Sequence, residues 1–285
     1  MGEAGAVSEP APAKLNLFLR VLGRREDGYH DIRSLIVPLT LADGVQARRA
    51  ERLLLTVVGE CAADVPRRED NLVVRAARAL AEAEGREPAA ELLLTKQIPV
   101  AAGLGGGSAD AAAALRALAR LWGVEGRPDR LREVAAGIGS DVPALLEVRP
   151  ALVRGRGDIV EPTESPRTWW VLLTQPFGVR AADAYRWWDE DGGQAGPDPE
   201  PMLTAIRSGE LERASSLLSN DLEAPVRARH AEIERAKERL LEAGALGAIM
   251  VGSGPSVAGL VRSGFHAEEV AAATGGVVVA SLHRG

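Results

Sequence analysis

The amino-acid sequence predicts an α+β fold in two domains, and three observations support this class. Apolar alternation near the N-terminus predicts several strands before the first helix, and strands return towards the C-terminus. The composition changes near residues 155–168, between two stretches long enough to bury separate cores. Hydrophobic residues make up 46% and charged residues 26% of the chain, as in globular proteins. We therefore expect one domain over residues 11–160, a second over 161–285 and a frayed tail over 1–10.

The first half of the chain is predicted to be mainly strands. Residues 13–21 alternate between apolar and polar side chains, which is typical of a strand. Charged residues and Gly28 predict a turn over residues 24–30. The other elements expected here are strands at 32–41, 45–50, 53–58 and 92–96, and amphipathic or alanine-rich helices at 71–84 and 108–122.

The second half is predicted to open with an apolar strand at residues 168–174. A loop rich in proline, glycine and aspartate follows at 189–201. The longest helix is expected over residues 227–243, because its apolar residues recur at helical spacing and Gly244 can end it. The remaining expected elements are helices at 202–208, 211–219 and 267–274, and strands at 246–251, 257–261 and 277–282.

Charge and composition exclude several classes of function. The formal net charge of −6 argues against a sequence-independent nucleic-acid binder, which needs a basic face. No stretch approaches the roughly 18 apolar residues of a membrane span, and the N-terminus lacks the layout of a signal peptide. The single Cys61 excludes an intramolecular disulfide. The histidines do not have the spacing of a zinc site; they are His30, His230, His266 and His283. We expect a cytoplasmic protein without a nucleic-acid or membrane partner.

The most informative segment is a glycine-rich loop that runs directly into the alanine-rich helix. Gly103, Gly105, Gly106 and Gly107 leave backbone N–H groups uncovered at a helix start, an arrangement that binds phosphate. No lysine adjoins these glycines, so the P-loop pattern is absent. Ser108 stands where the dinucleotide fingerprint has its third glycine. The alternative interpretation is a structural turn capped by Ser108.

Two polar residues share one face of the first predicted strand. Lys14 and Asn16 are separated by one residue, so their side chains point to the same side. A lysine on such a face could neutralise phosphate, and a solvated surface lysine is the alternative. Asp141 poses a similar choice, because an aspartate two residues before Pro143 is a good helix N-cap and also a candidate general base.

Two turns complete the candidate site. Residues 252–256 form a glycine turn between two apolar strands, which is either a plain hairpin loop or a second set of backbone N–H groups facing the site. The turn over residues 24–30 carries Tyr29 next to His30. This pair is consistent with surface packing, and an aromatic ring on a loop can also stack a nucleobase.

Together these segments resemble the GHMP kinase superfamily of small-molecule kinases. Three motifs carry the resemblance: Ala-Lys-Leu-Asn-Leu at 13–17, Pro-Val-Ala-Ala-Gly-Leu-Gly-Gly-Gly-Ser-Ala-Asp at 99–110, and Gly-Ser-Gly-Pro-Ser at 252–256. Further segments resemble one branch of the superfamily, at residues 24–30, 139–143, 155–158 and 220–223. The resemblance implies an N-terminal domain like ribosomal protein S5 domain 2 and a ferredoxin-like C-terminal domain.

The resemblance also implies a reaction and roles for individual residues. ATP would be the phosphoryl donor, with Mg²⁺ held by ligands that the sequence leaves unknown. Lys14 and Asp141 would be the catalytic pair, with Asp141 as the base. The residues implied around ATP are Pro99, Val100, Ala101, Ala102, Gly103, Leu104, Gly105, Gly106, Gly107, Ser108 and Ala109 at the phosphates, and Asn71 near the adenine.

The branch that this sequence resembles acts on a small molecule bearing a cytidine diphosphate group. Tyr29 and His30 would hold its cytosine, with Asn16 nearby and Tyr185 as a second aromatic. The acceptor would be the 2-hydroxyl of a methylerythritol unit, in the synthesis of isoprenoid precursors. We expect a monomer or a weak homodimer.

The sequence departs from the pattern of this branch at two places. Ala181 and Ala182 stand where a hydroxyl residue is common, which puts one substrate contact in doubt, and Asp158 replaces a glutamate. Two alternative functions stay open at this point. One is another GHMP kinase, acting on homoserine or mevalonate, and the other is a nucleotide-binding relative without catalysis.

Overall fold

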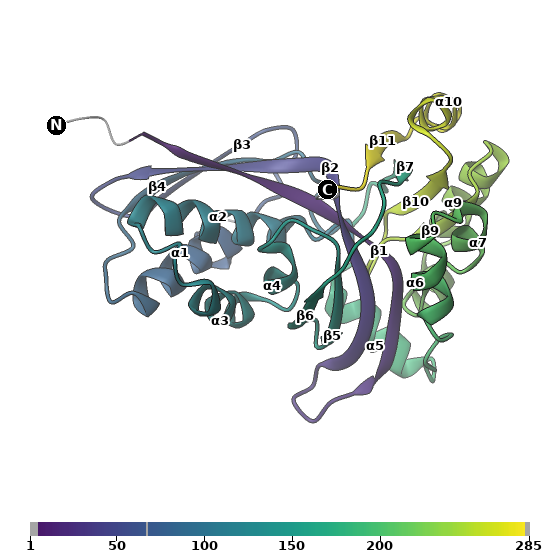
Figure 1. The fold of residues 1–285 in the computed structure, drawn as a ribbon, viewed down its shortest axis with the longest axis horizontal. Helices are drawn as coiled ribbons and strands as arrows, with labels where there is room; N and C mark the ends of the chain where they lie inside the picture. The colour runs from purple at the N-terminus through teal and green to yellow at the C-terminus, as the bar shows by residue number, and fades with distance from the viewer. Residues whose placement is uncertain (1–4, 67, 283–285) are drawn as a thin grey trace. The chain divides into compact units, whose positions relative to one another are not determined.

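The computed structural model describes residues 5–66 and 68–282, and Figure 1 shows their path. The chain divides into two compact units whose segments interleave along the sequence. Unit 1 comprises Met1–Ala13, Leu41–Val100 and Gly105–Val148; unit 2 comprises Lys14–Thr40, Ala101–Leu104 and Arg149–Gly285. Strands and helices are mixed in both, which confirms the α+β class. The functional boundary near residue 160 stays a prediction, because these units are not contiguous halves.

Two long strands pass through both units. β1 (Val7–Arg24) and β2 (His30–Arg49) are neighbours in one sheet, and the predicted turn between them is closed by a hydrogen bond from Arg25 N to Tyr29 O (2.7 Å). The two strands expected at 32–41 and 45–50 are therefore one strand. The polar Asp43 does not end it, because its buried carboxylate accepts hydrogen bonds from the backbone of another segment of unit 1.

The expected frayed tail is wrong for residues 7–10. They form the start of β1, and Arg116 donates to the Glu9 carboxylate (2.9 Å) and to the Pro10 carbonyl. These hydrogen bonds from Arg116 hold the segment in place, although its composition alone predicts an irregular tail. Residues 1–4 of the tail, and His283, lie outside the described residues.

Unit 1 is a layer of helices on a sheet. β4 pairs with β3 in parallel and with β2 in antiparallel fashion. Figure 1 shows the helices on one side of these strands, and Leu92, Leu94, Leu80 and Leu115 are almost fully buried between the layers. The further elements of unit 1 are β3 (Leu54–Val58), β4 (Ala90–Thr95), η1 (Arg68–Asp70), α1 (Leu72–Ala83), α2 (Gly106–Trp122), α3 (Pro128–Ile138) and α4 (Val142–Leu145).

Unit 2 contains a four-stranded antiparallel sheet with the order β11-β7-β10-β9. Its strands are β7 (Trp169–Leu173), β9 (Gly247–Met250), β10 (Val257–Val261) and β11 (Val277–Ala280). α9 (Glu232–Glu242) packs on β9 and β10, and α10 (Gly264–Thr274) packs on β7. This β-α-β-β-α-β order is the ferredoxin-like arrangement that the resemblance implied.

Smaller elements complete unit 2. β8 pairs with β1 in parallel, whereas β5 pairs with β2 and with β6. They are β5 (Ala151–Gly155), β6 (Ile159–Pro162), β8 (Ser219–Asn220), α5 (Ala181–Glu190), α6 (Glu200–Arg207), α7 (Leu211–Ser216) and α8 (Glu223–Arg229). None of the helices in the described part of the chain has the length and apolar character that a membrane crossing needs.

The single helix expected over residues 227–243 is wrong. α8 ends at Arg229 and α9 begins at Glu232, because His230 leaves the helical conformation (φ −137°, ψ 87°). The His230 ring stacks on Phe177, with ring centroids 4.7 Å apart. This contact joins residues far apart in sequence, so the helical periodicity could not reveal the break.

Candidate active site

Lys14 lies on β1 with its ammonium group in a buried polar cage. Its Nζ donates to Asn16 Oδ1 (2.7 Å) and to the carbonyl of Gly103 (2.7 Å), and the residue is only 4% exposed. A buried ammonium needs such partners because it loses its water. The solvated alternative for Lys14 is therefore wrong. Lys14 and Asn16 do share one face of the strand, as the alternation predicted.

A chain of hydrogen bonds orients Asn16. Its Nδ2 donates to Ser34 Oγ (2.8 Å), and that hydroxyl donates to the carbonyl of Phe18 (2.5 Å). Because the amide nitrogen faces Ser34, the amide oxygen faces Lys14. Ser34 was missed from the sequence, although a serine inside an apolar strand was a usable signal. Contact of Asn16 with a substrate stays a prediction.

The first part of the glycine loop belongs to the same unit as Lys14. The backbone N–H of Lys14 donates to the carbonyl of Leu104 (2.9 Å). Gly103 has a left-handed backbone (φ +79°), and a Cβ there would collide with Val251 O and lie 2.9 Å from Gly254 N. Gly103 thus lets the loop approach the glycine turn at 252–256, and that turn joins β9 to β10 as a hairpin.

The second part of the loop leads into α2 without a side-chain cap. The N-cap is Gly105 (φ 70°), while Ser108 lies inside the first turn, so the capping role considered for Ser108 is wrong. The first N–H groups of a helix have no partners within the helix. Uncapped, they fit an anion such as the phosphates of a nucleotide. A Cβ on Gly106 would lie 2.9 Å from Lys96 Nζ, so a side chain here would collide with the layer beneath.

Beneath the start of α2 lies a buried charge cluster that the sequence analysis missed. Lys96 Nζ donates to Asp110 Oδ2 (2.8 Å) and to Asp43 Oδ2, and all three side chains are at most 5% exposed. Burial and then the nearby Asp43 carboxylate raise the pKa of Asp110 to about 7, against the opposing effect of the Lys96 ammonium. Two carboxylates share one ammonium, so the positive charge of Lys96 compensates the charge of Asp110 only in part.

Asp141 and Asn71 both occupy N-cap positions in unit 1. Asn71 caps α1, since its Oδ1 accepts from Val73 N (2.8 Å) while its Nδ2 donates to Pro66 O (2.9 Å). Asp141 begins α4 without a capping hydrogen bond from its side chain. The structural interpretation of Asp141 as a cap therefore lacks its main interaction. The roles of Asp141 as a base and of Asn71 near an adenine stay predictions.

An aromatic cluster in unit 2 brings two of the predicted substrate residues together. The His30 ring stacks on Tyr185 (centroids 4.8 Å apart, planes 22° apart) and meets Trp188 edge-on (5.8 Å). His30 Nε2 lies 2.8 Å from Asp189 Oδ1. Because an ionised carboxylate only accepts hydrogen bonds, this contact favours a proton on Nε2. The α5 helix, which was not predicted, supplies all three partners of His30.

Tyr29 stands apart from this cluster. Its ring is half-exposed, and the Arg156 guanidinium lies 5.3 Å from the ring centroid. Arg156 also pairs with Asp158 (3.0 Å), the residue that replaces a glutamate of the branch. The ring of Tyr29 therefore keeps surface for a stacking partner. Arg156 was quoted within a motif at 155–158 but was given no role.

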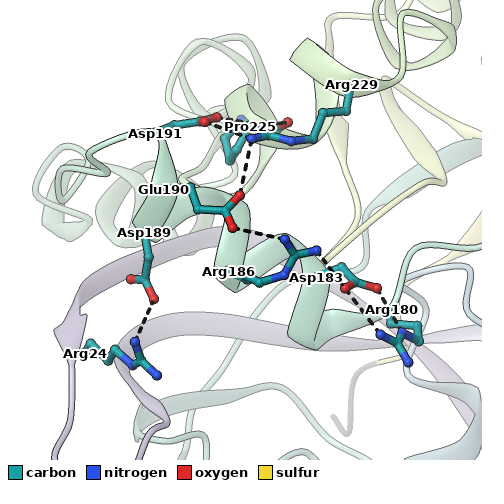
Figure 2. Close-up of polar contacts among 9 residues, drawn as sticks. All are labelled: Arg24, Arg180, Asp183, Arg186, Asp189, Glu190, Asp191, Pro225 and Arg229. Carbon is teal, nitrogen blue, oxygen red and sulfur yellow. Dashed lines mark hydrogen bonds and ion pairs between the residues drawn. The ribbon is translucent and has the colours of Figure 1, made fainter.

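Several ion pairs involve the α5 helix, as Figure 2 shows. Arg180 and Arg186 both bind Asp183, and these hydrogen bonds lower the pKa of that carboxyl to about 2. Asp189, whose other oxygen contacts His30, lies 3.8 Å from Arg24 of β1. Exposed pairs of this kind contribute little to stability. The pairs of Asp183 lie within α5 and its N-cap, whereas the pair of Asp189 with Arg24 joins the end of α5 to β1.

The described residues also include a cavity of about 570 Å³ in unit 1, beside β3 and α1. None of the predicted site residues contributes to its wall. The lining residues are Leu53, Leu54, Leu55, Val57, Val65, Pro66, Glu69, Val74 and Arg78.

Comparison with known proteins identifies the family to which this chain belongs. The family described as GHMP kinases N terminal domain matches residues 71–147, and GHMP kinases C terminal matches residues 202–275. The 4-diphosphocytidyl-2-C-methyl-D-erythritol kinase of Pelotomaculum thermopropionicum is 44% identical, over 92% of this chain and 91% of that protein. The enzyme of the same name from Deinococcus radiodurans is 43% identical, over 92% and 87%.

Solved structures agree with these relatives. A crystal structure of 4-(cytidine 5'-diphospho)-2C-methyl-D-erythritol kinase superposes with a TM-score of 0.82 at 35% identity, covering 98% of this chain and 100% of that chain. A homoserine kinase from Cytophaga hutchinsonii superposes with a TM-score of 0.76 at 20% identity, over 99% and 96%, which shows a shared fold alone. The chain belongs to the GHMP kinases, within the family of 4-diphosphocytidyl-2-C-methyl-D-erythritol kinases.

Proposed function

We propose that this protein transfers the γ-phosphoryl group of ATP to the 2-hydroxyl of 4-diphosphocytidyl-2-C-methyl-D-erythritol. The observation that carries the proposal is the buried ammonium of Lys14, held against the carbonyl of Gly103 in the glycine loop. A fixed, desolvated positive charge beside a phosphate-binding loop is what phosphoryl transfer requires. Membership of the family supplies the identity of the acceptor.

The chemistry that the protein has to supply is mainly positioning and charge neutralisation. In this proposal Asp141 accepts the proton of the attacking hydroxyl, and its side chain is not engaged in capping α4. Lys14 offsets negative charge on the transferring phosphoryl group. The hydrogen bonds to Asn16 and Gly103 hold the ammonium in one place, so no reorganisation is needed as charge develops.

The uncapped amino end of α2 supports the proposed binding of ATP. The backbone N–H groups of the first turn, together with the Ser108 hydroxyl, would contact the phosphates. Mg²⁺, when bound to the triphosphate, neutralises part of its charge. Phosphate oxygens and water are its usual ligands in such sites, and we assign it no side chain of this protein.

The aromatic residues of unit 2 support a cytosine-binding role. Tyr29 offers an exposed ring face for stacking, and Tyr185 and Asp189 hold His30 from two sides. In this proposal His30 hydrogen bonds the base while Tyr29 covers it. Ala181 and Ala182 carry no hydroxyl group, so the proposal includes no hydrogen bond from their side chains to the substrate.

A panel of acceptor alcohols assayed with ATP tests the proposal. The cytidine-bearing methylerythritol should be phosphorylated, and NMR should place the new phosphate on its 2-hydroxyl. Preference for homoserine or mevalonate would refute the acceptor, and absence of turnover with every alcohol would refute catalysis. We further propose that the enzyme is cytoplasmic. We also propose that it is a monomer or a weak homodimer, and light scattering after size-exclusion chromatography can check this oligomeric state.

A further inference from the structure

Asn220 uses both ends of its side-chain amide to tie the backbone together. Its Nδ2 donates to the carbonyls of Met250 (2.8 Å) and Gly252 (2.7 Å), and its Oδ1 accepts from Leu222 N (3.0 Å). Two carbonyls can only accept hydrogen bonds, so the orientation of the amide is determined. One amide proton is thus donated to the last residue of β9, and the other is donated to the turn that follows β9.

The position of Asn220 links this turn to the strand that carries Lys14. Asn220 belongs to β8, which pairs in parallel with β1, and its register partner there is Leu19. A second residue of the same segment reinforces the link, since Glu223 Oε2 accepts from Met250 N (2.8 Å). The segment 220–223, which helped to identify the branch from the sequence, thus fastens the 252–256 turn to β1.

The turn in question forms a wall of the Lys14 cage. A Cβ on Gly252 would collide with Lys14 Nζ and would lie 2.6 Å from Gly103 O. Gly252 therefore packs directly against the ammonium and against the carbonyl that binds it. Internal hydrogen bonds from Val251 N to Ser256 O and from Gly254 N to Val251 O (both 2.8 Å) keep the turn in one conformation.

We infer that Asn220 is a positioning residue for phosphoryl transfer, which holds the 252–256 turn and through Gly252 sets the position of the Lys14 ammonium. The inference rests on the catalytic role proposed for Lys14. Its physical basis is that Lys14 can hold one position only while the wall behind it is fixed. An aspartate at position 220 would place a carboxylate oxygen, which can only accept hydrogen bonds, opposite two carbonyl oxygens. The amide NH₂ group is therefore required.

The first test is a double-mutant cycle measured by steady-state kinetics. Asn220→Ala should lower kcat by about 10- to 100-fold, because a misplacement of ~1 Å at a reacting group has that cost. The KM values for both substrates should change little. In a Lys14→Ala background the same substitution should lower kcat by less than about twofold, since the residue acts through Lys14. Equal losses in both backgrounds would overturn the inference.

A matched control separates positioning from loss of stability. Asp221 is the next residue, and its Oδ2 accepts from Val21 N (2.8 Å) and Gly196 N (2.9 Å) without reaching the turn. Asp221→Ala should lower the melting temperature while kcat stays near the wild-type value. If it lowers kcat as much as Asn220→Ala, the effect is general and the inference fails. Asn220→Asp, which keeps the shape of the side chain, should reproduce the loss of kcat if Asn220→Ala folds poorly.

A third measurement does not depend on the identity of the substrate. Lys14 is nearly inaccessible, so an acylating reagent should label it slowly in the wild-type protein. Asn220→Ala should raise the labelling rate at Lys14 several-fold, as measured by mass spectrometry. Lys96, a buried lysine of unit 1, serves as the internal reference and should not change. An unchanged rate at Lys14 would overturn the positioning role, whereas an inactive acceptor panel with increased labelling would count against the proposed function alone.

Discussion

Replacing Asp110 by asparagine should stabilise the protein relative to the wild type, by an amount that grows as the pH rises from about 4 to about 7. In the native state burial and the Asp43 carboxylate raise the pKa of Asp110 from 3.8 to about 7. Between these two pH values the native protein keeps a proton that the unfolded chain has lost. The free energy of unfolding therefore falls as the pH rises from about 4 to about 7. Asparagine removes this dependence and can still accept a hydrogen bond from Lys96.

The size of the effect follows from the same values. Each unit of difference between the native and unfolded pKa changes the free energy of unfolding by about 1.36 kcal/mol. A pKa raised from 3.8 to about 7 therefore lowers the stability above pH 7 by about 4 kcal/mol. Asp110→Asn should thus gain up to about 4 kcal/mol of stability at pH 8, relative to any change at pH 4 where the carboxyl is already protonated. Relaxation around the buried group reduces the gain below this limit.

Urea unfolding of the wild type and of Asp110→Asn, at pH 4 and pH 8, measures the difference. Both proteins should expose the same surface on unfolding, so the denaturant slopes should agree and the midpoints should differ. A stability of the variant relative to the wild type that falls between pH 4 and pH 8 would refute the reasoning. An effect of the same size at both pH values would show that the proton on Asp110 is not its cause.

Three further predictions concern the proposed reaction. Asp141→Asn should lower kcat by about 10²- to 10⁴-fold, with little change in melting temperature because the side chain makes no capping bond; near-normal turnover would exclude Asp141 as the base. Gly106→Val should weaken ATP binding more than substrate binding, because its side chain would meet Lys96 and alter the start of α2. Separate calorimetric titrations decide this, and equal loss of both affinities would indicate misfolding. Tyr29→Ala should raise the substrate KM about 10- to 100-fold, since a stacked base contributes about 1–3 kcal/mol, whereas Tyr29→Phe should lose little. A change in melting temperature without a change in KM would leave Tyr29 as a packing residue.

Local chemistry explains which elements could be predicted. The helix after Asn71 has an N-cap and apolar spacing, and α1 forms where these signals place it. The strand around Lys14 alternates and forms part of β1. The turn at residues 252–256 forms the hairpin that its glycines indicate. In each case the determining interaction lies within a few residues, so a sequence pattern contains it.

Other elements depend on contacts between distant segments. The predicted break between residues 41 and 45 does not occur, because the Asp43 carboxylate accepts hydrogen bonds from the backbone N–H groups of residues 97 and 98 and β2 continues. The helix predicted through His230 is interrupted there, and the His230 ring stacks on Phe177. Residues 181–190, for which no helix was predicted, form α5 with Trp188 buried.

By itself the sequence determined the class of the fold and the family, and it named the glycine loop, Lys14 and Asp141 as candidates for the site. Only the tertiary structure decided that Lys14 is buried, that Asn220 holds the turn beside it, and that Lys96 lies between two carboxylates. The reason is physical. A charged side chain can be buried only where partners replace its water, and here those partners come from segments up to 89 residues away, as Gly103 is from Lys14.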